Sequence, residues 1–314
     1  MTAATPRTVE HYLDLLRAEL QGADPALIQD ALYDSEEHLR AEIAQAPGES
    51  QESVLARIVS SYGAPGEVAD AYRNTEVRVQ AALRTPKPRP KRSAIGRFFA
   101  VYSDPRAYLS LAYMLLALAT GIVYFTFAVT GSALTAGLAI LIVGVPFFLL
   151  FIGTARVLAL AEGRIVEAML GTRMPRRPVH PGPPASWWTR IIEMIKDPRT
   201  WGTLLYLFLM LPLGVFYFTF AVVGVVLSIG LFVAPLWVLL WHAGVVTIDG
   251  TVQSPHPALL PLISILGIVL LTVTLHLSRG IGYLHGQLAK FLLVRPAPTS
   301  DEAVAPAPTA AVPA

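Results

Sequence analysis

Apolar residues in the first quarter of the chain recur at the spacing of helices. Between residues 8 and 84, apolar side chains return every three or four positions, and breaks in the pattern coincide with glycine, proline and capping residues. Gly22 ends the first helix, Asp24-Pro25 begins the second as N-cap and first-turn proline, and Ser50 caps the third. The pattern predicts four short amphipathic helices that pack into a small helical domain over residues 1–84.

Beyond residue 93 this pattern gives way to long apolar runs, each close to or above the ~20 residues that cross a bilayer. The predicted spans are 107–130, 134–156, 200–223 and 258–278, with glycine turns at 131–137 and 224–230. A further apolar stretch, 225–241, is predicted to be re-entrant or a fifth span, with 242–257 outside. The predicted fold class is all-α: a small cytoplasmic helical domain, then a polytopic helical membrane domain at 93–295 with four full spans plus one re-entrant or fifth span.

Two segments of the membrane domain repeat each other. Asp104-Pro105-Arg106 recurs as Asp197-Pro198-Arg199, and Tyr124-Phe125-Thr126-Phe127 recurs as Tyr217-Phe218-Thr219-Phe220, both at an offset of 93. Further on, Gly163 matches Gly286 at an offset of 123, which places an insertion in the second half. This register predicts two structurally equivalent halves, 93–171 and 186–294.

Charge is scarce overall and unevenly placed. Charged residues make up 15% of the 314, below the ~25% of a typical soluble domain. Residues 1–84 hold fourteen Asp and Glu against seven Arg, whereas the rest holds eight acidic and seventeen basic residues. The Pro/basic linker 85–92 and the arginines beside the spans predict a multi-pass protein of the bacterial inner membrane with both termini cytoplasmic, its cations facing anionic headgroups. The Ala/Pro-rich tail 296–314 is predicted to be disordered.

The first domain resembles a known signalling domain. Its Tyr12-Leu13-x-x-Leu16, Glu36-Glu37-His38-Leu39 and Tyr62-Gly63-Ala64-Pro65 motifs are similar to those of the HAAS signalling domain. That family is associated with PadR-type transcriptional regulators, so the resemblance implies a cytoplasmic partner of this kind. Glu36, Glu37 and His38 are the candidate partner-binding residues. They lack the second histidine of a zinc-protease helix, and a solvated face with His38 at the core boundary is the alternative interpretation.

The membrane domain resembles the sensor domain at the front of bacterial two-component sensor histidine kinases. The resemblance rests on Leu211-Pro212-Leu213-Gly214, Pro235-Leu236-Trp237 and Leu275-His276-Leu277-x-Arg279, and covers about 93–295. It implies a signalling role. Twenty residues follow Val294, too few for a phosphoacceptor helix or an ATP-binding domain. We therefore expect any output to pass through the N-terminal domain or a partner.

Candidate sensing residues lie in the spans and in the inserted segment. They are Tyr124, Tyr217, Trp237, Trp241, His242, Asp249 and His276. Tyr124 and Tyr217 occupy matching positions in the two halves and can line a shared cavity; packing or an interhelical hydrogen bond is the alternative. For His276 the alternatives are a pH-responsive role and a plain interfacial position. Metal sensing by His242, Asp249 and His256 depends on folding to bring them together.

Catalytic chemistry finds no support in the sequence. There is no cysteine, which excludes disulfides, thiolate metal sites and a cysteine nucleophile. No Ser/His/Asp set, carboxylate pair or phosphate-cradling glycine loop is evident. We expect no enzyme activity, no cofactor, no metal and no direct nucleic-acid binding.

The leading hypothesis is a sensor that detects an envelope or lipid-borne stimulus in its membrane domain and signals through its N-terminal domain. A transporter or permease subunit is the alternative, because internal repeats are common in transporters. A scaffold for other membrane proteins is a third hypothesis. The sequence leaves open the stimulus, the partner and whether the chain forms homo-oligomers.

Overall fold

The structure is a computed structural model that describes residues 6–83, 93–138, 140–141, 143–177, 187–241, 246–248, 251–253 and 256–294. Helices dominate the fold, and the described strands form one short antiparallel pair, β1 (Val246–Ile248) and β2 (Thr251–Gln253). Within these residues, four helices are long and apolar enough to cross a membrane. The chain therefore has the build of a multi-pass helical membrane protein.

Four short helices form the N-terminal helical unit. They are α1 (Val9–Glu19), α2 (Pro25–Ala44), α3 (Gln51–Tyr62) and α4 (Pro65–Leu83). The Asp24 and Ser50 side chains accept hydrogen bonds from the backbone N–H groups of Ala26 and Ser53, so both predicted caps are confirmed. Their apolar faces meet in one core that includes Tyr12, whose hydroxyl donates to the Gly63 carbonyl at 3.0 Å.

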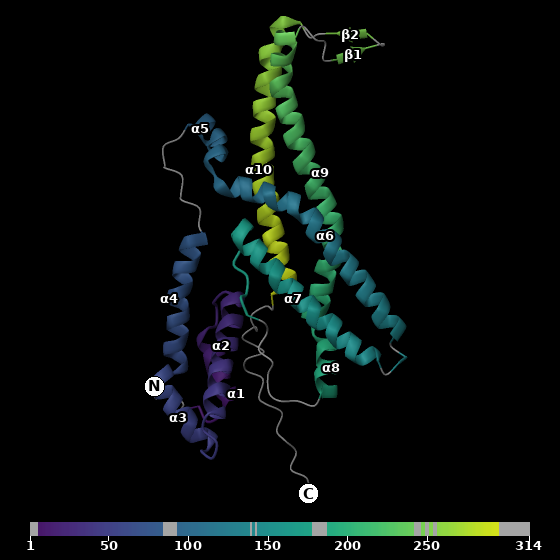
Figure 1. Cartoon of the computed structure of the whole chain (residues 1–314). Coiled ribbons are helices and arrows are strands. Elements are labelled where there is room, and N and C mark those ends of the chain that lie inside the picture. Colours follow the sequence, from purple (N-terminus) through teal and green to yellow (C-terminus); the bar gives the residue numbers. More distant parts are fainter. Residues whose placement is uncertain are drawn as a thin grey trace.

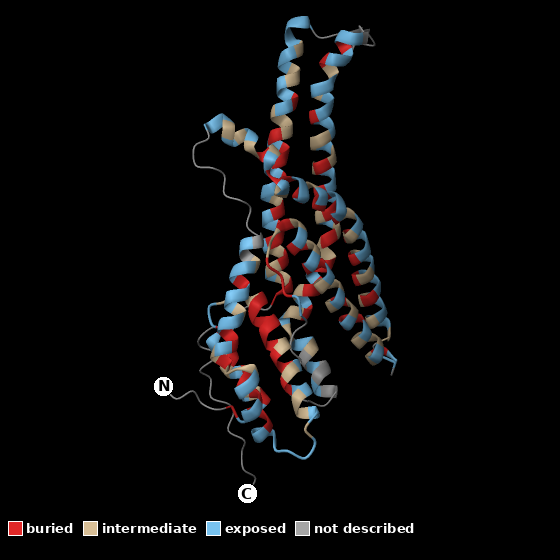
Figure 2. Ribbon diagram, turned by 60° about the vertical axis from the view of Figure 1, so that its left-hand side comes forward, coloured by how far each residue is buried: buried red, intermediate tan, exposed pale blue. Residues whose placement is uncertain are grey.

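The remaining helices form the membrane part. They are α5 (Ala94–Phe98), η1 (Phe99–Ser103), α6 (Pro105–Leu138), α7 (Gly144–Leu170), α8 (Trp187–Lys196), α9 (Pro198–Trp241), η2 (Pro257–Leu259) and α10 (Leu260–Leu293). Figure 1 shows two long hairpins, α6–α7 and α9–α10, whose tips point well apart. Buried residues gather where these hairpins cross and inside the N-terminal helical unit (Figure 2).

The predicted glycine turns are wrong in the structure. α9 continues through 224–230 to Trp241 as one helix of 44 residues, so 225–241 is neither re-entrant nor a fifth span. α6 likewise runs through 131–137 and ends at Leu138. Gly131 and Gly224 lie where a neighbouring helix comes close, because an added Cβ would meet Phe151 and Thr274, respectively. These two glycines therefore serve helix packing rather than turns.

α6 and α9 cross at their glycines. A Cβ on Gly121 would lie 2.5 Å from the Met210 carbonyl oxygen, and one on Gly214 would collide with the Ala117 carbonyl. Partner numbers on α9 fall as residue numbers on α6 rise, so the two helices cross in an antiparallel sense. Backbones packed this closely hold the crossing in a fixed register.

Candidate functional site

Six polar side chains gather where the hairpins cross. They are Tyr113 and Tyr124 from α6, Glu162 from α7, Tyr206 and Tyr217 from α9, and His285 from α10. We call these six residues the tyrosine cluster. Glu162 is 0% exposed and His285 is 1% exposed. Groups of this kind inside apolar helices are costly unless hydrogen-bonded, and within membrane spans they mark functional positions.

Glu162 accepts three hydrogen bonds from phenols. Its Oε1 accepts from the Tyr113 hydroxyl at 2.6 Å and from the Tyr206 hydroxyl at 3.0 Å. Its Oε2 accepts from the Tyr124 hydroxyl at 3.0 Å. Three hydroxyl donors satisfy the carboxylate without a countercharge from lysine or arginine, so Glu162 ties α7 to both α6 and α9.

His285 meets the other side of the same phenols. Its Nε2 lies 2.6 Å from the Tyr113 oxygen and 3.0 Å from the Tyr206 oxygen, and its Nδ1 lies 3.2 Å from the Tyr217 oxygen. Because Tyr113 and Tyr206 give their protons to Glu162, they offer lone pairs to the ring, and this assigns the hydrogen to Nε2. Nδ1 then accepts from the Tyr217 hydroxyl, so His285 ties α10 to both α6 and α9.

Residues in and around the tyrosine cluster form pairs whose members lie 93 or 123 positions apart, the two offsets of the sequence repeat. Tyr113 and Tyr206 both bridge Glu162 and His285, whereas Tyr124 bonds Glu162 and Tyr217 lies against His285. Both tyrosine pairs lie 93 positions apart, and Glu162 and His285 lie 123 apart. Nearby, Asp104 pairs with Arg279 at 2.7 Å and Asp197 with Arg156 at 3.8 Å, at the same offsets. The contacts across the crossing are thus reciprocal.

A second polar group joins the N-terminal helical unit to the membrane part. Asp30 on α2 accepts through Oδ1 from the backbone N–H groups of Arg176 at 2.6 Å and Arg177 at 2.8 Å. Its Oδ2 accepts from the Arg173 guanidinium at 2.9 Å. Gln29 donates to the Arg177 carbonyl at 2.5 Å. We call the hydrogen bonds and ion pairs that α2 and α4 make with residues 173–177 and Lys290 the docking contact.

Arg173 is the centre of the docking contact. Its side chain is 8% exposed and pairs with Asp30 at 2.9 Å, Glu76 of α4 at 3.1 Å and Glu167 of α7 at 3.6 Å. Outer pairs join Arg177 to Asp34 at 2.7 Å and Lys290 to Asp24 at 2.5 Å. The acidic N-terminal unit and the basic membrane part therefore meet through opposite charges.

Burial makes these charges depend on each other. Burial raises the pKa of Asp30 above its ordinary value, although hydrogen bonds from Arg173 and from two backbone N–H groups act to lower it. Burial also opposes the charge of Arg173, but hydrogen bonds to Asp30 and Glu76 outweigh it and raise the pKa of this guanidinium. Each charge is thus stabilised in the docked arrangement chiefly by its partner.

The predicted sensing residues are divided between the cluster and the surface. Tyr124 and Tyr217 both belong to the tyrosine cluster. Trp237 is 53% exposed on α9, near the tip of the long hairpin. Trp241 ends α9, and His242 and Asp249 lie outside the described residues. His276 lies apart from the cluster, where its Nε2 is 2.9 Å from the Phe98 carbonyl of α5 and its ring stacks on Phe98.

The predicted partner-binding residues do not share one exposed face. Glu36 is 3% exposed and pairs with Arg40 at 2.8 Å, so burial removes it from the proposed surface. Glu37 is exposed. His38 is half-buried and stacks on Tyr62, which agrees with the core-boundary interpretation.

Sequence reasoning missed Glu162, His285, Tyr113, Tyr206 and the docking contact. The predicted spans end at Arg156 and Ser278, whereas α7 runs to Leu170 and α10 to Leu293. The signal was present, because both missed pairs lie at the repeat offsets. Across the described residues, no group of three or more His, Asp or Glu side chains is arranged to hold a metal ion.

A family described as "Putative sensor" matches residues 113–293, more than half of the chain. The chain belongs to the Sensor family. The matched segment begins at Tyr113 and contains all six residues of the tyrosine cluster, so the expected sensor membrane domain is confirmed. The Sensor match does not extend over the N-terminal helical unit. Comparisons with curated proteins and with solved structures find no match.

Proposed function

We propose that the chain is a non-enzymatic signalling protein of the bacterial inner membrane. Its membrane part, built as two equivalent halves around the tyrosine cluster, detects an envelope or lipid-borne stimulus. The docking contact relays the change to the N-terminal helical unit, a HAAS-like cytoplasmic domain. That unit then binds or releases a cytoplasmic protein partner, for which a PadR-type transcriptional regulator is the expected class.

The observation that carries this proposal is the course of α7 and the segment after it. α7 holds Glu162 in the tyrosine cluster and Glu167 beside Arg173. Five residues of helix separate them, a rise of about 7.5 Å. α7 ends at Leu170, the left-handed C-cap residue Gly171 has a φ of 73°, and Arg173 follows. A shift of α7 at the cluster therefore moves residues that hold the N-terminal unit.

The chemistry of the docking contact supports a releasable joint. Its members are charged and polar, and interfaces of this kind between parts of one chain are weaker than apolar ones. Breaking one partner of a buried pair leaves the other charge uncompensated, so the contact opens as a unit rather than bond by bond. A joint with two distinct arrangements is what a relay requires.

The experiment that tests this proposal compares partner capture by the full-length protein with the docking contact intact and broken. Wild type and Arg173→Gln are purified from host membranes, and the cytoplasmic proteins that come with each are identified by mass spectrometry. Arg7→Gln, which removes an exposed arginine of the N-terminal unit away from the docking contact, is the matched control. The proposal expects a transcriptional regulator whose amount changes at least severalfold in Arg173→Gln and not in Arg7→Gln.

Identical partner sets in all three proteins would contradict the relay. If, in addition, the purified protein moved a solute across proteoliposome membranes, the transporter alternative would replace the signalling proposal. A regulator captured equally by all variants would leave a scaffold as the better description.

A further inference from the structure

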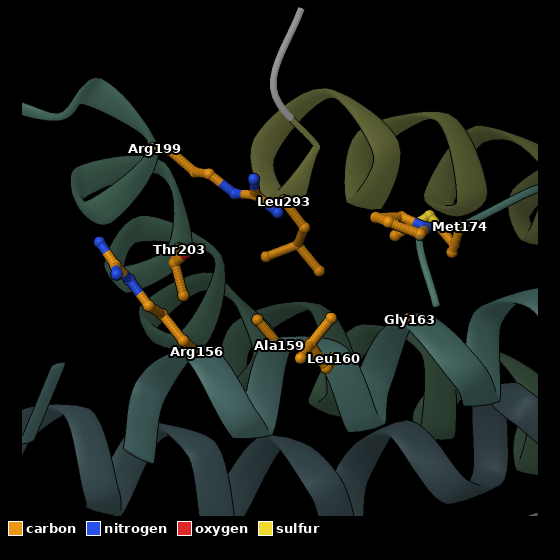
Figure 3. A pocket seen from close by; sticks show the side chains of 9 residues that line it. Arg156, Ala159, Leu160, Gly163, Met174, Arg199, Thr203 and Leu293 are labelled. Carbon is orange, nitrogen blue, oxygen red and sulfur yellow. The ribbon is translucent and has the colours of Figure 1, made fainter. Parts of the chain in front are cut away.

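A small pocket lies between α7, α9 and the end of α10, beside the tyrosine cluster. Its volume is about 70 Å³, and Figure 3 shows Arg156 and Arg199 at its side with Thr203 between them. At ~10–15 Å³ per water centre this is room for about five water molecules, which is enough for a phosphate group. Apolar residues complete the lining: Ala159, Leu160, Met174, Pro175 and Leu293.

The matching position in the other half is closed. Residues at the two offsets from Ala159, Thr203 and Leu293 are Gly282, Ser110 and Leu170. A Cβ on Gly282 would lie 2.5 Å from the Ser110 hydroxyl and 3.1 Å from a Leu170 methyl, so these three residues fill the space. In the first half, Ala159 carries the Cβ that Gly282 lacks. That methyl group, facing a threonine rather than a serine, keeps α7 and α9 apart.

The arginine in the open half is also the more weakly held one. Arg279 pairs with Asp104 at 2.7 Å in the closed half, whereas the Arg156–Asp197 distance is 3.8 Å. The guanidinium groups of Arg156 and Arg199 both line the open pocket. Arginine pairs with phosphate oxygens through two parallel hydrogen bonds, and basic pockets between spans on the cytoplasmic side suit anionic headgroups.

We propose that this pocket binds a phosphate ester, with Arg156 and Arg199 on the phosphate oxygens and the apolar residues beneath. An anionic phospholipid headgroup and a free phosphate compound share this chemistry. The pocket touches Gly163, next to Glu162, and Met174, next to Arg173. A bound phosphate therefore acts on the tyrosine cluster and the docking contact together; this last step rests on the proposed signalling function, but the binding itself does not.

The binding test uses the purified full-length chain and a fluorescent phosphatidylglycerol. Affinity is measured in phosphatidylcholine nanodiscs for wild type, Arg156→Gln/Arg199→Gln, Ala159→Leu and Arg97→Gln. We expect the double variant to bind about tenfold more weakly or worse, since each charge-assisted hydrogen bond contributes strongly. Ala159→Leu fills the pocket without removing charge and should lose a similar factor. Arg97→Gln removes an exposed arginine outside this pocket and should match wild type.

A second arm identifies the source of the phosphate. Inorganic phosphate is titrated against wild type and the double variant in nanodiscs of phosphatidylcholine alone, with the melting temperature as readout. Stabilisation of wild type only, together with displacement of the lipid probe, supports a soluble ligand. Lipid binding that phosphate does not displace supports a headgroup. The melting temperature without ligand shows whether each variant is folded.

The proposal is overturned if neither probe distinguishes wild type from the double variant. It is also overturned if Arg97→Gln weakens lipid binding as much as the double variant, because that result indicates general attraction to the membrane surface. A short thiol cross-linker on Gln29→Cys/Arg177→Cys, in a chain that has no other cysteine, reads the docking contact separately. Phosphate binding without any change in cross-linking keeps the site and refutes the proposed relay.

Discussion

Two buried groups of charged side chains can be compared within this molecule. In the tyrosine cluster, one carboxylate and one imidazole are surrounded by four phenols, and no arginine or lysine is among them. In the docking contact, the Arg173 guanidinium faces two carboxylates of the N-terminal unit, Asp30 and Glu76, and it also pairs with Glu167 of α7. The first group satisfies its charge by hydroxyl donors, and the second by opposite charge.

Under the proposed function, we expect this difference to separate a permanent junction from a releasable one. Phenols carry large apolar rings that pack among the helices while their hydroxyls bond the carboxylate, so the tyrosine cluster is part of the core. The docking contact instead joins two units that have separate hydrophobic cores, and its members are charged side chains. We therefore expect mutations in the first group to unfold the membrane part, and mutations in the second to undock the N-terminal unit.

The largest effect is expected for Glu162→Ala. It leaves the hydroxyls of Tyr113, Tyr124 and Tyr206 without their acceptor, and each buried unsatisfied group costs about 1–3 kcal/mol. The free energy of unfolding should fall by about 4 kcal/mol, measured by thermal unfolding in detergent. Glu162→Gln keeps one acceptor oxygen and should lose less than half as much. Equal stability of the alanine variant and wild type would mean that the cluster does not hold the helices.

A somewhat smaller effect, of a different kind, is expected for Arg173→Gln. It leaves buried carboxylates uncompensated, and breaking a buried pair in this way costs about 3 kcal/mol. The loss should appear as undocking: cross-linking of Gln29→Cys/Arg177→Cys falls severalfold, while thermal unfolding of the membrane part stays unchanged. If cross-linking and the thermal stability of the membrane part fall together, the tyrosine cluster and the docking contact belong to one cooperative structure. The comparison between them then fails.

The next largest loss of stability is expected for Gly214→Ala, where α6 and α9 cross. A Cβ on Gly214 collides with the Ala117 backbone, which cannot rotate away, so Gly214→Ala forces α6 and α9 apart. Overpacking of this kind costs about 2 kcal/mol. Gly230→Ala on the same helix meets nothing within 4 Å and should be neutral or slightly stabilising. Thermal unfolding of the two variants side by side separates packing from helix propensity.

The smallest effect is expected at the rim of the docking contact. Arg177→Gln removes a pair with Asp34 in which the arginine side chain is 49% exposed, and such pairs contribute about 0.5 kcal/mol. Cross-linking between the units is not suited to this variant, so protease sensitivity of the linker at rising salt is the measurement. Added salt should erase the difference from wild type. A large effect that persists at high salt would place Arg177 among the central residues.

Local signals in the sequence were enough for the helices and their caps. Asp24-Pro25 and Ser50 begin helices because their side chains bond the first N–H groups, a contact within four residues. Long apolar runs likewise identified the candidate membrane helices. For the caps and the apolar runs, signals from neighbouring residues were therefore enough.

Signals that depend on the other half of the chain were misinterpreted. The predicted spans end at Arg156 and Ser278, but Arg156 pairs with Asp197 and Arg279 with Asp104, which lowers the cost of placing arginine along a long helix. Gly224 looks like a turn residue in the sequence because its packing partner, Thr274, lies fifty residues away. The acidic residues of 1–84 and the basic residues of the membrane part predict attraction between the two regions. They do not indicate that α2 and α4 would enclose Arg173 rather than another arginine.

The unequal lengths of the two hairpins have a mechanical consequence in a bilayer. α6 and α7 have 34 and 27 residues, whereas α9 and α10 have 44 and 34. At 1.5 Å per residue, α9 is about 66 Å long, roughly twice the ~30 Å hydrocarbon thickness. Apolar side chains stay exposed to its end, at Leu239 and Leu240, so only a steep tilt keeps α9 immersed. When the bilayer becomes thinner or thicker, the two hairpins therefore have to change their tilt by different amounts. This difference puts mechanical strain on the crossing between them.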